Sequence, residues 1–258
     1  MKDKKNLIIF VLIIIIAILI GLLICNNKKE KVVEEVDKNI DFNLEGYYQI
    51  GEDLKLFDSA FNDSYSDYFG YLYKSDSLDA KDFDIKAALY LALYSELNHD
   101  GETNYINSEI VKSNFYKVFG NDLEYKPMSF EAGRVFEFNY NEATGFYEIN
   151  SPGVGGVYFP EIHSKNDYST ETEDSVVVSR KMFYLEYVSN NSGTDLTKID
   201  IYKNIDKKDK VGTMTLSDSG VDEEKIFKKY KDKLDSYKLT FKKNDSGEFY
   251  FSKIEKEK

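Results

Sequence analysis

Residues 7–25 read LIIFVLIIIIAILIGLLIC, and this stretch governs where the rest of the chain can lie. It holds no charged residue and no proline, and its least apolar members are Gly21 and Cys25. At a rise of about 1.5 Å per residue, a helix of this length reaches roughly 28 Å, which matches the hydrocarbon core of a bilayer. We therefore predict a transmembrane helix over residues 7–25.

The residues that flank this span favour an uncleaved signal anchor. A cleaved secretory signal has a shorter apolar core followed by small residues, whereas this stretch ends in Leu-Leu-Ile-Cys. A lipoprotein signal would place glycine, alanine or serine directly before the lipidated cysteine, and here Ile24 precedes Cys25. A cleaved signal and a lipoprotein are the two alternatives to the anchor.

The lysines around the span do little to orient it. Three lie in the six residues before it and three in the six after it, so the positive-inside rule barely discriminates. Six residues precede the span and more than 200 follow it, and anchors of this bacterial type usually export the long end. We expect a single-pass protein of the cell membrane, with residues 1–6 as a cytoplasmic tail and the C-terminal domain extracytoplasmic.

Cys25 is the only cysteine, so the exported part has no thiol. This excludes disulfides, thiol nucleophiles, cysteine-based zinc sites, iron–sulfur clusters and attached haem from that part. An ordinary hydrophobic core must hold the domain together, and 21 tyrosines and 18 phenylalanines supply ample apolar surface for one.

Charge is spread unevenly along the chain. Residues 41–175 hold 26 acidic and 9 basic side chains, whereas residues 176–258 hold 15 acidic and 18 basic ones. Nucleic-acid binding is disfavoured, because a phosphate backbone requires a concentrated cationic face. The acidic half predicts a solvated surface, with attraction for divalent cations or a basic partner as the alternative.

The composition divides the exported part into four segments. Residues 26–41 are largely polar with nearly balanced charges and predict a stalk or linker. An acidic α+β region is expected over 42–165, a polar linker or loop over 166–175, and a C-terminal α+β module over 176–258.

Periodicity in the acidic region predicts helices and a hairpin. Apolar residues recur at helical spacing in three segments, 53–61, 82–97 and 108–119. Asp82 or Asp84 can cap the second helix, and Gly120 stands where a left-handed cap would end the third. The aromatic run 68–74 predicts a strand. From residue 134 the period changes to two around a polar turn at 141–145, which predicts a β-hairpin.

The C-terminal module shows a run of strands, then a helix, then a returning hairpin. Three β-rich segments are separated by turn sequences, 176–188, 197–203 and 210–216. A helix is expected over 222–237, and the closing hairpin has an inward face that contains Leu239, Phe241, Phe249 and Phe251. The predicted fold class is α+β: an N-terminal transmembrane helix, a helical pair with a β-hairpin, and a C-terminal antiparallel sheet packed with one helix.

Several of these features together resemble a group of known proteins. These features are the apolar anchor, FYKVFG at 115–120, the hairpin followed by PGVGG at 152–156, and YKLTFKKNDSGEFYFSKIEK at 237–256. The chain is similar in these respects to uncharacterised membrane-anchored or secreted proteins of AT-rich Gram-positive-type bacteria. The resemblance implies an extracytoplasmic location and does not imply any particular activity.

The two histidines, His99 and His163, are the first candidates for chemistry. A Ser–His–Asp site lacks its G-x-S-x-G elbow or any comparable nucleophile signature. Glu161 and His163 form an E-x-H pair that could bind a metal, but no second histidine lies nearby. We therefore assign no catalytic residue, no metal ligand and no cofactor.

Two loops and a tyrosine cluster are further candidates for binding. The segment 96–107 contains Asp-Gly but lacks the carboxylates a calcium loop needs at its first and last positions, so it predicts a turn between helices. The segment 152–156 lacks the GK[ST] sequence of a phosphate loop and also predicts a tight turn. The tyrosine cluster consists of Tyr65, Tyr68, Tyr71 and Tyr73. We expect these side chains to pack in the core, with an exposed binding face as the alternative.

These observations favour a non-catalytic binding or interaction module at the cell envelope. The expected partners are the membrane and an envelope protein or cell-wall component, with no nucleic acid. The alternative is a membrane-tethered envelope enzyme that uses carboxylates, which would require a deep cleft with inward-facing acidic side chains.

Overall fold

The computed structural model describes residues 31–32, 48–97, 104–133, 136–150, 160–189, 196–216 and 220–258. The predicted span over 7–25 and most of the predicted stalk lie outside these residues. Among the helices that are described, none combines the length and the apolar character needed to cross a bilayer.

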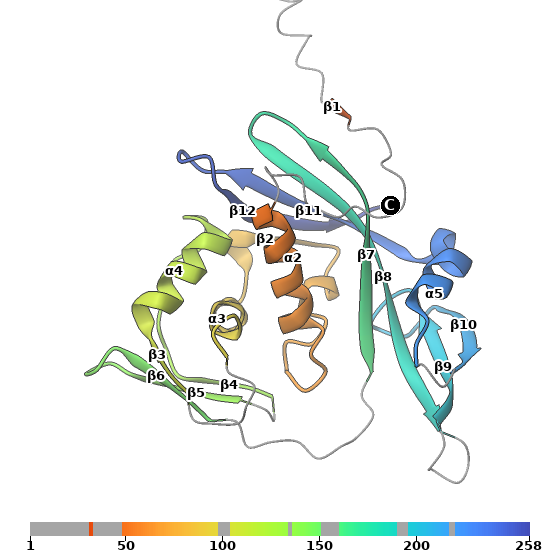
Figure 1. The fold of residues 1–258 in the computed structure, drawn as a ribbon, viewed down its shortest axis with the longest axis horizontal. Helices are drawn as coiled ribbons and strands as arrows, with labels where there is room; N and C mark the ends of the chain where they lie inside the picture. Colours follow the sequence, from red (N-terminus) through yellow and green to blue (C-terminus); the bar gives the residue numbers. More distant parts are fainter. Residues whose placement is uncertain are drawn as a thin grey trace, which may run out of the picture.

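The described part of the chain is α+β with antiparallel strand pairing, as predicted (Figure 1). The larger sheet has eight strands, and six of them lie side by side in the order β1 (Lys31–Val32), β7 (Glu161–Glu171), β8 (Ser175–Ser189), β11 (Asp235–Lys243), β12 (Phe249–Lys256) and β2 (Ser77–Asp79). Beyond the start of β11 at Asp235, β8 pairs with β9 (Leu196–Tyr202), which in turn pairs with β10 (Lys210–Thr215).

A smaller sheet has four strands. Their order is β3 (Asn104–Asn107), β6 (Phe146–Asn150), β5 (Phe136–Asn141) and β4 (Phe130–Ala132). The predicted hairpin is confirmed as β5 and β6, and its turn is closed by the Gly145 amide, which donates to the Asn141 carbonyl at 2.8 Å.

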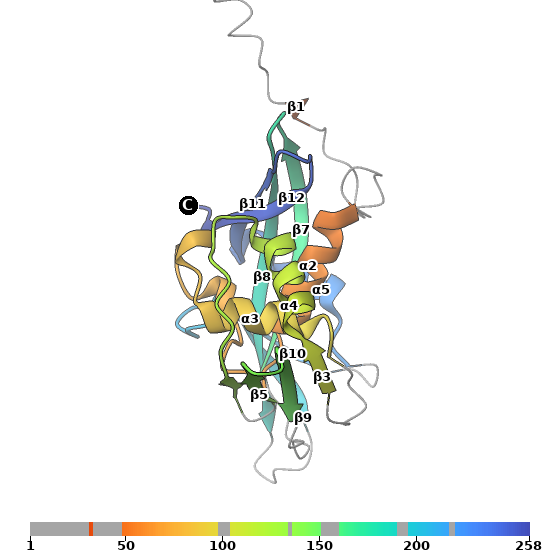
Figure 2. The ribbon, with the colours of Figure 1, turned by 90° about the vertical axis from the view of Figure 1, so that its left-hand side faces the viewer.

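Three helices fill the space between the two sheets: α2 (Tyr48–Phe61), α3 (Ile85–Tyr94) and α4 (Ser108–Phe119). Figure 2 shows them in front of β7 and β8. One hydrophobic core joins these helices to both sheets, so the regions 42–165 and 176–258 share a core. Because α3 lies between the two sheets and beside α4, its residues 87–93 are buried on every side.

The start of α3 follows the capping chemistry expected from the sequence, whereas Gly120 ends α4 with a ψ of −140°, which is not the predicted left-handed cap. The Asp84 side chain accepts from the amides of Lys86 and Ala87 at 2.9 and 3.1 Å, which fixes the start of α3. At the end of α4, Gly120 has a φ of +56°, where an L side chain would be strained, and its amide donates to the Tyr116 carbonyl.

The opposite face of the large sheet carries α5 (Glu223–Tyr230). Successive residues of β8 point to opposite faces, so Met182 and Tyr184 enter the main core, whereas Phe183 and Leu185 enter a second cluster with α5. Gly212 of β10 permits this packing, because a Cβ there would lie 2.1 Å from the Tyr230 hydroxyl.

Three predicted boundaries are wrong. The segment 166–175, predicted as a linker or loop, mostly belongs to β7, which continues to Glu171 and turns directly into β8. The helix predicted over 222–237 ends at Tyr230 and is followed by the 3-10 turn η3 (Lys231–Lys233), because β11 begins at Asp235 and pairs with β8. The helix predicted from residue 53 begins earlier, at Tyr48.

The strand predicted over 68–74 is also wrong. This segment forms turns and the 3-10 helix η1 (Tyr71–Tyr73), which follows Gly70 at a φ of +67°. A second short 3-10 helix, η2 (Ala80–Asp82), leads into α3. Aromatic side chains are enriched in strands, but here they pack against the core from turns and a 3-10 helix, so composition alone does not identify the structure.

An ion pair between a buried arginine and a half-buried aspartate connects α2 to the large sheet. The Arg180 side chain on β8 is 2 % exposed, and its Nη2 donates to Asp58 Oδ2 at 2.8 Å. The other carboxylate oxygen of Asp58 accepts from the Ser164 hydroxyl of β7 at 3.1 Å. Asp58 therefore neutralises a guanidinium in the protein interior and joins one helix to two strands.

Removing one partner of this pair is expected to cost more stability than removing both. Asp58→Ala leaves Arg180 charged and buried, so we expect the free energy of unfolding to fall by about 3 kcal/mol or more. The double variant Asp58→Ala/Arg180→Met should recover most of the lost stability, because neither charge of the pair remains. Urea unfolding of the full chain in detergent, followed by circular dichroism, checks both values. Equal stability of the single and double variants would contradict this account.

A buried carboxyl lies on the same helix. Asp53 is 3 % exposed, and burial raises the pKa of its carboxyl to about 7, although the nearby Lys117 opposes part of that rise. Between pH about 4 and 7 the folded state therefore binds a proton that the unfolded state has lost. The contribution of the Asp53 carboxyl to stability must fall as the pH rises through this window.

We expect Asp53→Asn to remove this decline, because an amide does not titrate. At neutral pH the variant should be more stable than the wild type by up to about 4 kcal/mol, the free energy that corresponds to about three pKa units. Urea unfolding at about pH 4 and pH 7 measures the difference, with the exposed Asp82→Asn as the matched control. A decline with pH that persists in Asp53→Asn would refute the assignment.

Candidate functional site

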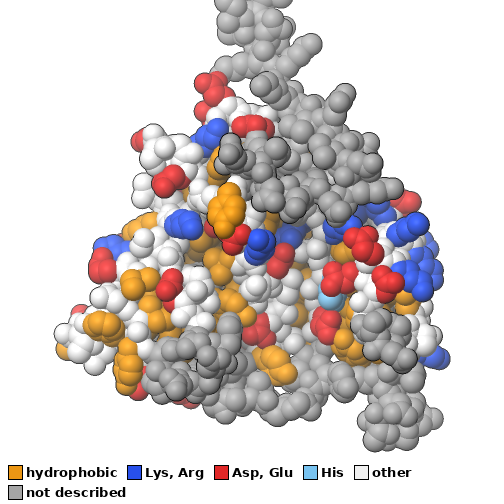
Figure 3. Space-filling model, in the orientation of Figure 1, with side chains coloured by type: hydrophobic (Ala, Val, Ile, Leu, Met, Phe, Trp, Pro, Cys, Tyr) orange, Lys and Arg blue, Asp and Glu red, His pale blue; other side chains and the backbone are white. Residues whose placement is uncertain are grey.

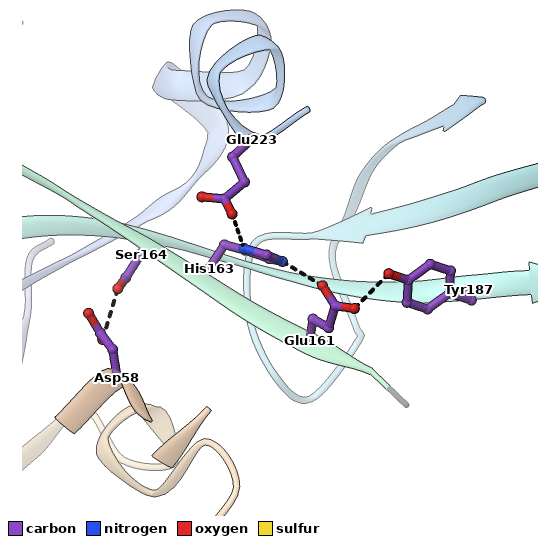
Figure 4. Close-up of polar contacts among 6 residues, drawn as sticks. All are labelled: Asp58, Glu161, His163, Ser164, Tyr187 and Glu223. Atoms are coloured by element: carbon purple, nitrogen blue, oxygen red, sulfur yellow. Dashed lines mark hydrogen bonds and ion pairs between the residues drawn. The ribbon is translucent and has the colours of Figure 1, made fainter. Parts of the chain in front are cut away.

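His163 lies at the centre of a group of ionisable side chains around β7 (Figure 4). Its Nε2 is 2.9 Å from Glu161 Oε2 on the same strand, and its Nδ1 is 3.0 Å from Glu223 Oε1 in the first turn of α5. The ring stacks on Phe183 with centroids 4.9 Å apart. Tyr187 of β8 donates its hydroxyl to Glu161 at 2.6 Å.

The two carboxylates determine the charge of the histidine. Burial alone would lower the pKa of His163, but its hydrogen bonds to Glu161 and Glu223 raise that pKa to about 9. The same hydrogen bonds lower the pKa of each glutamate, against the opposing effect of burial. At neutral pH the group is an imidazolium held between two carboxylates, and Figure 3 shows acidic side chains on both sides of the histidine.

This geometry does not suit catalysis or metal binding by His163. Both ring nitrogens are occupied, so neither has a free lone pair for accepting a proton or coordinating a metal. The two carboxylates lie against opposite nitrogens and do not converge on one point with the ring, and the described residues contain no cluster suited to a metal ion. The E-x-H pair is therefore a structural clamp that joins β7 to α5.

The neighbouring serine does not complete a catalytic triad either. Ser164 follows His163 on β7, so its side chain points to the opposite face of the sheet. Its hydroxyl donates to Asp58 there, as Figure 4 shows. The strand thus separates serine and histidine.

The other predicted candidates lie outside the described residues, form regular structure or pack against the core. His99 and the segment 152–156 lie outside them. In the segment 96–107, residues 104–107 form β3, and Asn107 caps α4 by accepting from the Glu109 amide, so this segment is more than the predicted turn.

The tyrosine cluster packs inward. Tyr73 is 5 % exposed and its ring contacts Tyr237, while Tyr71 packs on Phe83 with centroids 4.7 Å apart. Tyr68 lies against Tyr90 at 5.2 Å. The core interpretation of these tyrosines is therefore confirmed for the three whose ring contacts are described.

The candidate binding surface that sequence reasoning missed is the outer face of the small sheet. Tyr105 on β3 is 65 % exposed and Phe146 on β6 is 38 % exposed. They are among the few large apolar side chains that the described residues present to solvent. Beside them lies a shallow hollow of about 750 Å³, lined by Ser129, residues 139–143 and Glu148.

Comparisons of this chain with protein-family models, with curated proteins and with solved structures gave no match.

The charged state of His163 leads to a titration experiment. The chain has two histidines, so His99→Gln leaves His163 as the single imidazole that NMR can follow. The midpoint of its titration should lie near pH 9. Glu223→Gln should move that midpoint down toward the ordinary value of about 6.5. The stability that comes from the raised pKa of His163 is complete below about pH 6.5 and is lost as the pH rises through 9.

The matched control is Glu224→Gln, which removes the neighbouring carboxylate that pairs with Lys165 and leaves the His163 partners in place. This variant should keep the midpoint near that of the parent. A midpoint near 6.5 in the parent would show that the imidazole is not clamped.

Proposed function

We propose that this chain is a single-pass membrane protein whose α+β body lies outside the cytoplasm and acts as a non-catalytic binding or interaction module at the cell envelope. The apolar, charge-free stretch over 7–25 supports the membrane anchor. The observation that carries the binding role is the outer face of the small sheet, where aromatic side chains and a hollow stand open to solvent.

The described chemistry favours binding over catalysis. His163, the one histidine that the structure describes, has both ring nitrogens engaged with carboxylates. Asp53 has the raised pKa expected of a catalytic acid, but it is 3 % exposed and lies inside the core, where a substrate has no access. The alternative of a carboxylate enzyme therefore gains no support from this group.

The proposed topology can be tested with engineered thiols, because Cys25 is the only natural one. In a Cys25→Ser background, Asp245→Cys places a thiol in the exposed turn between β11 and β12. We expect a membrane-impermeant maleimide to label this variant on intact cells, because the body faces outward.

The matched control is Asp3→Cys in the same background. Its thiol lies in the predicted cytoplasmic tail and should react only after the membrane is permeabilised. Labelling of Asp3→Cys but not Asp245→Cys on intact cells would reverse the proposed orientation, and recovery of the full chain in the soluble fraction would exclude the anchor.

A further inference from the structure

The outer face of the small sheet is organised in three cross-strand rows. Strand register places Tyr105, Glu148 and Asn139 in the first row, and Asn107, Phe146 and Asn141 in the second. The third row contains Asn150, Glu137 and Glu131. Because side chains alternate along a strand, all of these point away from the core, which holds their neighbours Ile106, Tyr147 and Phe138.

The aromatic members of this face are placed for contact with a ligand. Tyr105 and Phe146 lie on adjacent strands in neighbouring rows, so their rings form the apolar part of the surface. Ile110, in the first turn of α4 just after β3, is 46 % exposed. Figure 3 shows hydrophobic side chains at this end of the molecule.

The charge of the face has one sign. Glu131, Glu137 and Glu148 stand on three of its strands, and Glu142 lines the adjoining hollow. The four strands, as the structure describes them, contain no lysine, arginine or histidine. Glu131 lies directly opposite Glu137, an arrangement that costs stability unless a cation lies close to both.

We infer that the outer face of the small sheet binds an extended basic segment of another protein, rich in lysine or arginine. The glutamates complement its cations, and Tyr105 and Phe146 provide ring faces on which ammonium or guanidinium groups can pack. The exposed carboxamide of Asn139 supplies donors and acceptors for a peptide backbone. This inference rests on the proposed binding function and names its partner class.

Charge complementarity separates this partner from the other occupants of such a face. A second copy of this chain that docked through the same face would bring the same glutamates against each other. An anionic polymer is disfavoured by the same glutamates. A neutral glycan would use the rings and carboxamides without the carboxylates, so binding that ignores the glutamates would identify it.

The test uses the full chain in detergent micelles and a short fluorescein-labelled peptide of alternating lysine and glycine. Fluorescence anisotropy should show saturable binding that weakens as salt is added, because exposed charge pairs are screened. Peptides with glutamate or serine in place of lysine should bind at least about tenfold more weakly, since they lack the cations that the face complements.

Two variants place the site on the sheet. Glu131→Gln/Glu137→Gln should weaken lysine-peptide binding about fivefold, as expected for the loss of two exposed charge pairs. Its unfolding midpoint should stay the same or rise, since the like-charge pair is removed. Tyr105→Ala should weaken binding about threefold without a change of charge.

The matched control is Asp232→Asn/Asp245→Asn, which removes the same number of exposed charges from η3 and from the turn between β11 and β12. It should leave binding within about twofold of the parent, because exposed charges far from the peptide are screened. Equal weakening in the control would show that overall negative charge attracts the peptide, and this would overturn the proposal.

The labelling of Asp245→Cys on intact cells is independent of these binding data. An outward-facing body that binds none of the three peptides would refute the basic partner and leave the anchored topology in place. Selective binding by a chain that proves to face the cytoplasm would keep the site and refute the envelope location.

Discussion

The fold depends on the burial of both faces of β8. This strand sends Met182 and Tyr184 into the core with α2, α3 and α4, and it sends Phe183 and Leu185 under α5. A strand buried on both sides can carry polar residues only if each has a partner, and Arg180 has one in Asp58. The position of α2, and through it the packing of the helical layer, therefore depends on a charge inside the core.

The sequence predicted the elements whose partners are apolar. Helix α4 and the hairpin of β5 and β6 were found because their buried residues recur at regular spacing. Strand β7 was missed because polar residues occupy both of its faces, and Ile162 is the one buried apolar residue among them. On one face Glu161 and His163 form ion pairs with each other and with α5, and on the other Ser164 bonds to Asp58, so no apolar period marks the strand.

The candidate site depends even more on contacts between distant parts of the chain, which sequence patterns do not show. His163 was found in the sequence, but its role depends on Glu223, which lies 60 residues further along the chain and reaches it only through the packing of α5. The outer face of the small sheet is assembled from β3, β4, β5 and β6, and β3 is four residues long. Periodicity cannot detect so short a strand, and without its register nothing places Tyr105 beside Glu148.

The proposed anchor and the proposed binding face are compatible in space. Strand β1 pairs with the end of β7, where Lys31 faces Glu171, and six residue steps separate Cys25 from Lys31. Such a segment spans at most about 22 Å, so a span over 7–25 would hold this end of the large sheet near the bilayer. Figure 1 shows β1 and the small sheet at opposite ends of the molecule, with the helices between them. The outer face of the small sheet would then point away from the membrane, where a partner of the envelope can reach it.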